Sequence, residues 1–222
     1  MMRLPLIFIL LIFAPATFAQ TSPQIRATSK ARINGMSYKA ICFADERIVV
    51  KNGSGKTVLS IAAQDYIAFF DFSFTDFDGD GYKDLLIVYS SNTPGICNLY
   101  SYQKASGQFI KIDGFDIYPA PLRIHGTKVF YSYHHSGCAD SNWDSDLFII
   151  KNYKPVKLGN ISGNEFGNSG IKDGIYIHKF KSGKELLYKT MPISTINRYK
   201  DYKWGFIATY WKKYYKEFAK GY

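Results

Sequence analysis

The sequence has few cysteines and no second long apolar run, and both shortages limit what the protein can be. Its three cysteines are far apart, which excludes the short paired clusters of structural zinc sites. An odd number also leaves at least one thiol outside any internal disulfide. After residue 19, no segment is apolar for the roughly 18 residues that a membrane-spanning helix needs. We therefore expect a mature protein that does not cross a membrane.

The one long apolar run lies at the N-terminus, where it follows a basic residue. It covers residues 4–13, which is too short to span a bilayer, and it leads into small residues. Thr17 and Ala19 occupy the −3 and −1 positions of a cleavage site. We predict that residues 1–19 are a signal peptide, that the mature chain begins at Gln20, and that it is periplasmic or secreted.

Acidic residues are also scarce: 18 Asp and Glu face 28 Lys and Arg, and the formal net charge is +10. A basic exported protein meets anionic envelope polymers, lipid headgroups or acidic proteins, although a basic surface also serves plain solubility. Because we expect the protein outside the cytoplasm, we expect no nucleic-acid partner.

Aromatic residues are plentiful, at 17% of the chain, and many short apolar runs are separated by glycine-rich turns. This pattern predicts a mainly β protein of antiparallel sheets, propeller-like or sandwich-like. Residues 20–34 are polar and predict a flexible N-terminus, followed by a single β domain over 35–222. Near the end, apolar side chains recur at three- and four-residue steps with lysines between them. They predict one amphipathic helix over about 203–218 that packs on the sheet, with binding to a membrane surface as the alternative.

The most informative segment is DFDGDGYKD at residues 76–84, which sets carboxylates at positions 1, 3, 5 and 9 and glycine at position 6. Such a loop wraps a hard cation, because Ca²⁺ prefers six to eight oxygen ligands and glycine permits the sharp turn. An EF-hand is excluded, since its twelfth position requires Glu and here is Ile87. The predicted Ca²⁺ ligands are the side chains of Asp76, Asp78, Asp80 and Asp84 and the backbone carbonyl of Tyr82.

A second polar segment, residues 131–146, contains two histidines, a cysteine, three aspartates and a tryptophan. We expect a long loop that presents His135 and Trp143 to a partner. Two alternatives remain: a second cation site among the alternating residues 140–146, and acid–base catalysis by His135 with Asp144. The adjacent histidines would face opposite ways in a strand, which disfavours a shared zinc ion. No nucleophile is identifiable, so we predict no catalytic residues and no enzyme.

The calcium loop and the strand–turn–strand segment after it, residues 97–109, resemble a family of exported bacterial proteins with one FG-GAP- or VCBS-like calcium loop. Some members have a fold similar to periplasmic lysozyme inhibitors and protect the cell wall from muramidases. Only one complete loop is present, so a complete integrin-like propeller is excluded. The resemblance implies Ca²⁺ as the bound ion and an immunity protein as the function.

These observations together predict an exported, calcium-stabilised binding protein, in its sharpest form an inhibitor of, or immunity protein against, a cell-wall hydrolase. An adhesion or envelope-glycan-binding module is the alternative, and an uncharacterised hydrolase is the second. We further predict a disulfide between Cys97 and Cys138, which flank one connected unit and would close a loop of about 40 residues. Cys42 is then a buried thiol.

Overall fold

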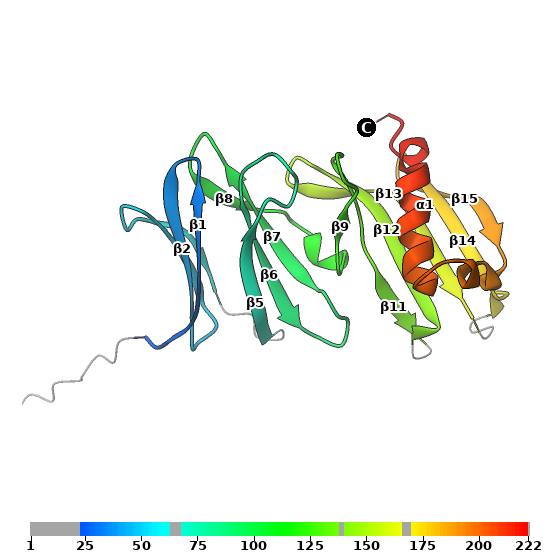
Figure 1. Cartoon of the computed structure of the whole chain (residues 1–222), viewed down its shortest axis with the longest axis horizontal. Coiled ribbons are helices and arrows are strands. Elements are labelled where there is room, and N and C mark those ends of the chain that lie inside the picture. Colours follow the sequence, from blue (N-terminus) through cyan, green and yellow to red (C-terminus); the bar gives the residue numbers. More distant parts are fainter. Residues whose placement is uncertain (1–22, 63–67, 138–139, 166–169, 222) are drawn as a thin grey trace, which may run out of the picture.

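The computed structural model describes residues 23–62, 68–137, 140–165 and 170–221, and it consists of three antiparallel sheets and one C-terminal α-helix (Figure 1). The expectation of a mainly β protein with antiparallel sheets and a terminal helix is confirmed. Among the described residues, no helix combines the length and apolar character needed to cross a membrane.

The first two sheets are four-stranded meanders in which each strand pairs with the next one in the chain. The first sheet contains β1 (Ile25–Ile33), β2 (Met36–Phe43), β3 (Ile48–Asn52) and β4 (Thr57–Ile61). The second contains β5 (Ala68–Thr75), β6 (Asp84–Ser90), β7 (Cys97–Gln103) and β8 (Gln108–Lys111). Short turns join the strands, as the glycine-rich punctuation of the sequence predicts.

The third sheet has the strand order β15-β14-β13-β12-β10-β9, and β11 pairs with β12. A 3₁₀ turn, η1 (Phe115–Ile117), precedes it, and a second, η4 (Ile193–Arg198), follows it. Its strands are β9 (Leu122–Arg123), β10 (Val129–Tyr131), β11 (His134–Gly137), β12 (Asn142–Lys151), β13 (Lys154–Asn164), β14 (Gly174–Lys181) and β15 (Lys184–Met191).

The sheets stand in a row (Figure 1). Apolar layers of buried side chains lie between them. Strand β6 shows how alternation builds the layers: Leu85 and Ile87 face the first sheet, whereas Leu86 and Val88 face the third. The second sheet is thus apolar on both faces. The third sheet is covered on its other face by the helix, with a third apolar layer between them.

The helix α1 (Tyr202–Phe218) lies within one residue of its predicted bounds. It buries Phe206, Tyr210 and Trp211 against the third sheet, and the Trp211 Nε1 donates a hydrogen bond of 2.8 Å to Ser145 Oγ. Docking on the sheet, the preferred prediction, is therefore confirmed. Trp204 differs from expectation, because its side chain is 50% exposed rather than part of the buried stripe.

The prediction of a flexible segment over 20–34 was wrong for its greater part, because residues 25–33 form β1. Its buried face has two small apolar residues, Ala27 and Ala31, and one large one, Ile33, and polar residues alternate with them. Strand β8 is the second strand of the hairpin expected from residues 97–109, whereas strand β13 was not expected. Glycine and proline in β13, at Pro155, Gly159 and Gly163, make that segment read as a turn.

Cys42 is a buried free thiol, as predicted. Cys97 is also a buried free thiol, in the layer between the second and third sheets. Cys138, its predicted partner, lies outside the described residues. The predicted disulfide therefore has no support from the structure.

Candidate functional site

The loop between β5 and β6 folds around its own aspartates. Asp78 Oδ1 accepts a hydrogen bond from the Asp80 backbone N–H at 3.0 Å, and Asp80 Oδ1 accepts one from Tyr82 at 2.8 Å. Asp76 Oδ2 accepts one from the Gly81 N–H at 3.2 Å. Gly81 has φ of 90°, the left-handed conformation for which glycine was expected at this position. The aspartates thus turn inwards over consecutive backbone amides.

Three of the predicted ligands converge. One carboxylate oxygen each from Asp76, Asp78 and Asp80 lies within 4.8 Å of the other two. Two oxygens bound to one Ca²⁺ at roughly 2.3–2.6 Å can lie at most about 5 Å apart, so this spacing fits a single calcium ion. All three are hard oxygen donors, as Ca²⁺ prefers. No other group of three metal-ligating side chains is found in the described part of the chain.

Asp84 has a different position from the other three aspartates, at the buried base of the loop. Its Oδ2 accepts from the Phe77 N–H at 3.2 Å and its Oδ1 from the Tyr102 N–H at 2.9 Å, which ties the loop to β7. Burial raises the pKa of Asp84 to about 7, with the Tyr102 amide opposing the shift and the charge of Asp78 adding to it. Calcium ligation by Asp84 and by the carbonyl of Tyr82 stays a prediction.

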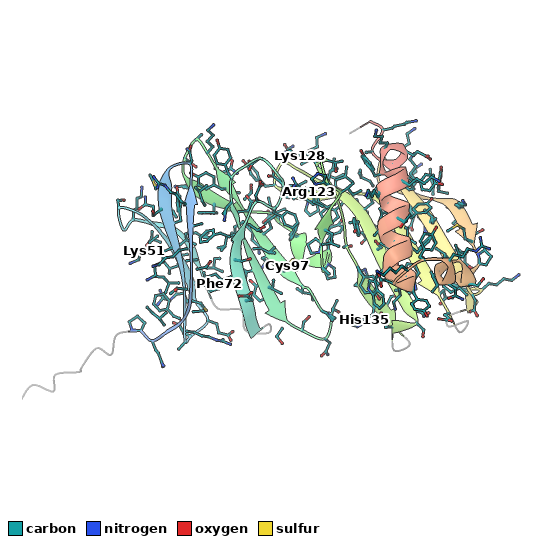
Figure 2. All side chains as sticks on the ribbon, viewed as in Figure 1. Lys51, Phe72, Cys97, Arg123, Lys128 and His135 are labelled. Carbon is teal, nitrogen blue, oxygen red and sulfur yellow. The ribbon has the colours of Figure 1, made fainter. Side chains whose placement is uncertain are left out.

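Two basic residues from the third sheet and its β9–β10 turn reach this loop (Figure 2). Lys128 Nζ lies 3.2 Å from Asp78 Oδ2. The guanidinium of Arg123 lies over Gly79, in the space that a Cβ at position 79 would occupy. These cations partly neutralise the aspartates, so a metal ion would compete with Lys128 for Asp78.

A second polar site lies on the face of the third sheet opposite the helix, next to Phe148 and Ile150, which belong to the apolar layer shared with the second sheet. Cross-strand register aligns His134, Asp144, Ser162 and Tyr176 in one row across β11, β12, β13 and β14. The next row contains Asp146, Asn160 and His178. Because directly opposite residues share a face, these side chains form one polar surface.

A groove of about 450 Å³ runs across this surface, within the size range of small-ligand sites. Its lining includes Ser136, Asp144, Ser162, Asn164, Tyr176 and His178. The Nδ1 atom of His178 is buried and has no hydrogen-bond partner among the described residues; it lies 3.5 Å from the Glu185 carboxylate. Hydroxyl, amide, carboxylate and imidazole groups thus converge on one hollow.

Asp146 is the structural anchor of this polar surface. It is only 6% exposed, and its Oδ1 lies 2.6 Å from Lys157 Nζ and accepts a bond of 2.8 Å from Asn160 Nδ2. The same amide group lies 3.3 Å from Asp144 Oδ1. Asn160 therefore bridges the two carboxylates and fixes Asp144 at the groove.

The expected long loop over residues 131–146 is largely β-structure, and the expected exposure of Trp143 was wrong. Trp143 is 1% exposed, because it faces the helix and lies over Gly163 on β13. His135 pairs with Trp143 and so lies on that same face, whereas His134 pairs with Asp144. The acid–base pair of His135 with Asp144 is thus separated by the sheet.

The alternating residues 140–146 do not converge as cation ligands either. Asp140 hydrogen-bonds Tyr133 at 2.6 Å and pairs with Lys203 at the start of the helix at 2.6 Å. Asn142 accepts a hydrogen bond from the Glu165 N–H, and Asp146 is paired with Lys157. The segment therefore joins strands and helix instead of wrapping an ion.

Sequence reasoning missed the groove residues of β13 and β14. In β14, Ile175 and Ile177 alternate with Tyr176 and His178, and this alternation was the available signal for a polar outer face. In β13 the signal was hidden, because a register shift lies opposite Leu147 and Phe148.

The fold and site define a three-sheet antiparallel β protein with an aspartate-rich loop and a polar groove. No protein-family model matches the chain, and no similar curated protein is found. Among solved structures, the chain is similar to one described as a Xanthomonas Type IV Secretion System related protein. The two share 13% identity and a TM-score of 0.50, over 73% of this chain and 93% of the other. At this identity the likeness concerns the fold alone.

Proposed function

We propose that the protein is an exported binding protein, stabilised by Ca²⁺ in the loop of residues 76–84, that holds its ligand at the groove of the third sheet. The groove carries the proposal, because fixed polar groups from four strands converge on one hollow of ligand size. Export rests on the predicted signal peptide, and calcium on the three converging aspartates.

The sharpest version is an inhibitor of, or immunity protein against, a cell-wall hydrolase. An inhibitor needs a rigid element to present to its target, because preorganisation lowers the entropic cost of binding. The β11–β12 pair is such an element: Asp140 fastens it to Lys203 of the helix and to Tyr133. His135 is partly exposed on β11, on the face opposite the groove, so in this version a partner protein would contact the β11–β12 pair from both sides (Figure 2). The family resemblance of the calcium loop supports the same version.

The second candidate is a glycan-binding module, and the composition of the groove favours it. Sugars are recognised by planar polar side chains that accept and donate hydrogen bonds, and Asp144, Asn164 and His178 offer such groups. Tyr176 adds an aromatic ring to the lining, which supplies apolar contact area.

A turbidity assay separates these versions. Peptidoglycan is cleared by a panel of muramidases and amidases with and without micromolar protein, and binding of purified glycan fragments is measured in parallel. Inhibition of one hydrolase supports the inhibitor version; glycan binding without inhibition replaces it with the glycan module. Clearing of peptidoglycan by the protein itself establishes the hydrolase alternative and overturns both.

Asp144→Asn tests the groove, with Asp113→Asn as the matched control at an exposed carboxylate outside it. Loss of one charge-assisted hydrogen bond should weaken binding by roughly tenfold. Equal binding by both variants and the unmodified protein would place the ligand elsewhere.

A further inference from the structure

The outer face of the first sheet forms one end of the row of sheets (Figure 1). In β2, Tyr38, Ala40 and Cys42 point into the first core layer. Ser37 and Lys39 alternate with them and point outwards. The side chains on this outer face therefore take no part in the core.

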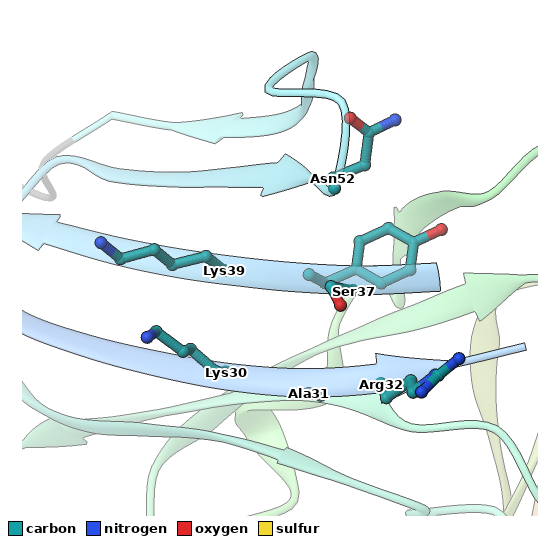
Figure 3. A pocket seen from close by; sticks show the side chains of 8 residues that line it. Lys30, Ala31, Arg32, Ser37, Lys39 and Asn52 are labelled. Atoms are coloured by element: carbon teal, nitrogen blue, oxygen red, sulfur yellow. The ribbon is translucent and has the colours of Figure 1, made fainter. Parts of the chain in front are cut away.

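Cross-strand register places three lysines directly opposite one another on that face. Lys30 of β1 pairs with Lys39 of β2, and Lys39 pairs with Lys51 of β3. Adjacent strands lie about 4.8 Å apart, so the three side chains begin within roughly 10 Å. Figure 3 shows Lys30 and Lys39 side by side on their strands. We call these three residues, with Arg32 beside them, the lysine ladder.

The lysine ladder has no counter-charge in the part of the chain that the structure describes. The ion pairs of this sheet, Arg26 with Glu46 and Arg47 with Asp45, use the two carboxylates of the β2–β3 turn. Like charges directly opposite in a sheet are destabilising. Lysines also face each other in pairs beside two hairpin turns of the third sheet, Lys151 with Lys154 and Lys181 with Lys184, but only the ladder continues the row over three strands of the described chain.

A shallow pocket of about 500 Å³ lies along the ladder. Lys30, Arg32, Ser37, Lys39 and Asn52 line it with ammonium, guanidinium, hydroxyl and amide groups (Figure 3). Arg binds phosphate through its planar fork, and Lys binds it as a point charge. Ala31 and Tyr38 also line the pocket, but Tyr38 is only 2% exposed, so the pocket offers no exposed aromatic anchor of the kind that seats proteins in a lipid interface.

We propose that the lysine ladder binds a linear phosphate-bearing polymer that runs across β1, β2 and β3. Successive phosphates would screen the repulsion among Lys30, Lys39 and Lys51, while Arg32 engages a phosphate at the edge of the pocket. This site is separate from the groove and from the calcium loop, so it stands independently of the function proposed above.

The test compares two triple variants that lose the same charge. One is Lys30→Gln/Lys39→Gln/Lys51→Gln; the matched control is Lys111→Gln/Lys189→Gln/Lys212→Gln, at exposed lysines of β8, β15 and α1 that have no lysine opposite them in a sheet. Binding to long-chain inorganic polyphosphate is measured across a salt series. The ladder variant should lose at least about tenfold in affinity at 0.1 M salt, with a salt dependence shallower by roughly two counter-ions. The control should bind nearly as the unmodified protein does.

The melting temperature distinguishes binding from a structural role. The ladder variant should melt no lower than the unmodified protein, because its repulsion has been removed. Equal losses in both variants would reduce the effect to net charge and overturn the proposal. Ladder-dependent binding to phosphatidylglycerol vesicles or polyglutamate without binding to polyphosphate would also overturn it, in favour of a lipid layer or an acidic protein.

Discussion

The burial of Trp143 depends on its neighbour on the adjacent strand. From its polar sequence neighbours it reads as an exposed contact residue, yet it is fully buried. The reason lies on another strand: Gly163 is its partner in the register, and a Cβ there would come within 2.1 Å of the indole ring. The absence of a side chain at position 163 creates the space that the indole fills.

Gly163→Ala should therefore destabilise the protein by about 2–3 kcal/mol, because the buried ring must shift in a closely packed layer. Gly53→Ala is the matched control: its Cβ would meet its nearest neighbour at an ordinary 3.6 Å. Urea unfolding of both variants measures the difference. Equal stability of the two variants would contradict the role assigned to Gly163.

At the scale of elements, helix α1 begins without a side-chain cap, at Asp201 in the left-handed conformation. Its first turn is held instead by Lys203, which pairs with Asp140 at 2.6 Å. Burial acts to raise the pKa of Asp140, but the hydrogen bonds from Lys203 and Tyr133 outweigh it, and the net shift of the pKa is downwards. The contact thus joins the helix to the loop before β12.

This shift gives the helix contact a definite pH dependence. A carboxyl group whose pKa is lower in the folded protein stabilises the fold above its unfolded pKa of about 3.9, and the stabilisation is lost as the pH falls through the folded pKa. Asp140→Asn should cost up to about 1 kcal/mol at neutral pH, since a partly exposed pair is screened by solvent. Unfolding measured at neutral pH and near pH 3 should show a smaller cost at the lower pH; a cost independent of pH would contradict the assignment.

Calcium binding by the loop between β5 and β6 should stabilise the folded protein. With a Kd near 10⁻⁴ M, as for extracellular modules, about 1 mM Ca²⁺ adds roughly 1.4 kcal/mol of stability. The melting temperature should then rise by a few degrees over that in EDTA. Asp78→Ala and Asp80→Ala should abolish the rise, while Asp113→Ala, at an exposed carboxylate outside the loop, should retain it.

The Lys128→Gln variant tests calcium binding in the opposite direction in the same experiment. Because Lys128 lies 3.2 Å from Asp78, its removal should tighten calcium binding. Identical melting curves with calcium and with EDTA, in all variants, would remove the metal from the proposal.

Features that depend on residues close in the sequence could be predicted, and features that depend on the pairing of distant strands could not. The convergence of Asp76, Asp78 and Asp80 and the position of helix α1 depend on residues close in sequence, at fixed spacings, and both were predicted from the sequence. The groove depends on the register of four strands, which brings Asp144, Ser162 and Tyr176 together across the sheet. The alternation of apolar and polar residues along one strand shows which side chains share a face, but it does not show which residues of the neighbouring strands lie opposite them. Strand β1 was missed because two of the three apolar residues on its buried face are alanines, and the third, Ile33, lies at its end.

At the scale of the whole molecule, the second sheet takes part in two apolar layers, one on each face. Loss of either layer would expose a face of that sheet to water, so the layers should not separate independently. Two buried thiols report on them: Cys42 lies in the layer with the first sheet, and Cys97 in the layer with the third. Burial raises the pKa of Cys97 to about 12, with Asp116 adding to the shift, and burial also raises the pKa of Cys42.

Both thiols should therefore resist a thiol reagent in the folded protein, since the thiolate is the reactive form. In a Cys138→Ser variant, labelling followed by peptide mass analysis across a urea series should show Cys42 and Cys97 becoming reactive at the same urea concentration. Reaction of Cys97 well before Cys42 would mean that the third sheet and helix detach first. In the unmodified protein, labelling of Cys97 in urea only after reduction, with Cys42 labelled without reductant, would support the disulfide with Cys138. Labelling of Cys97 without reductant would rule that disulfide out.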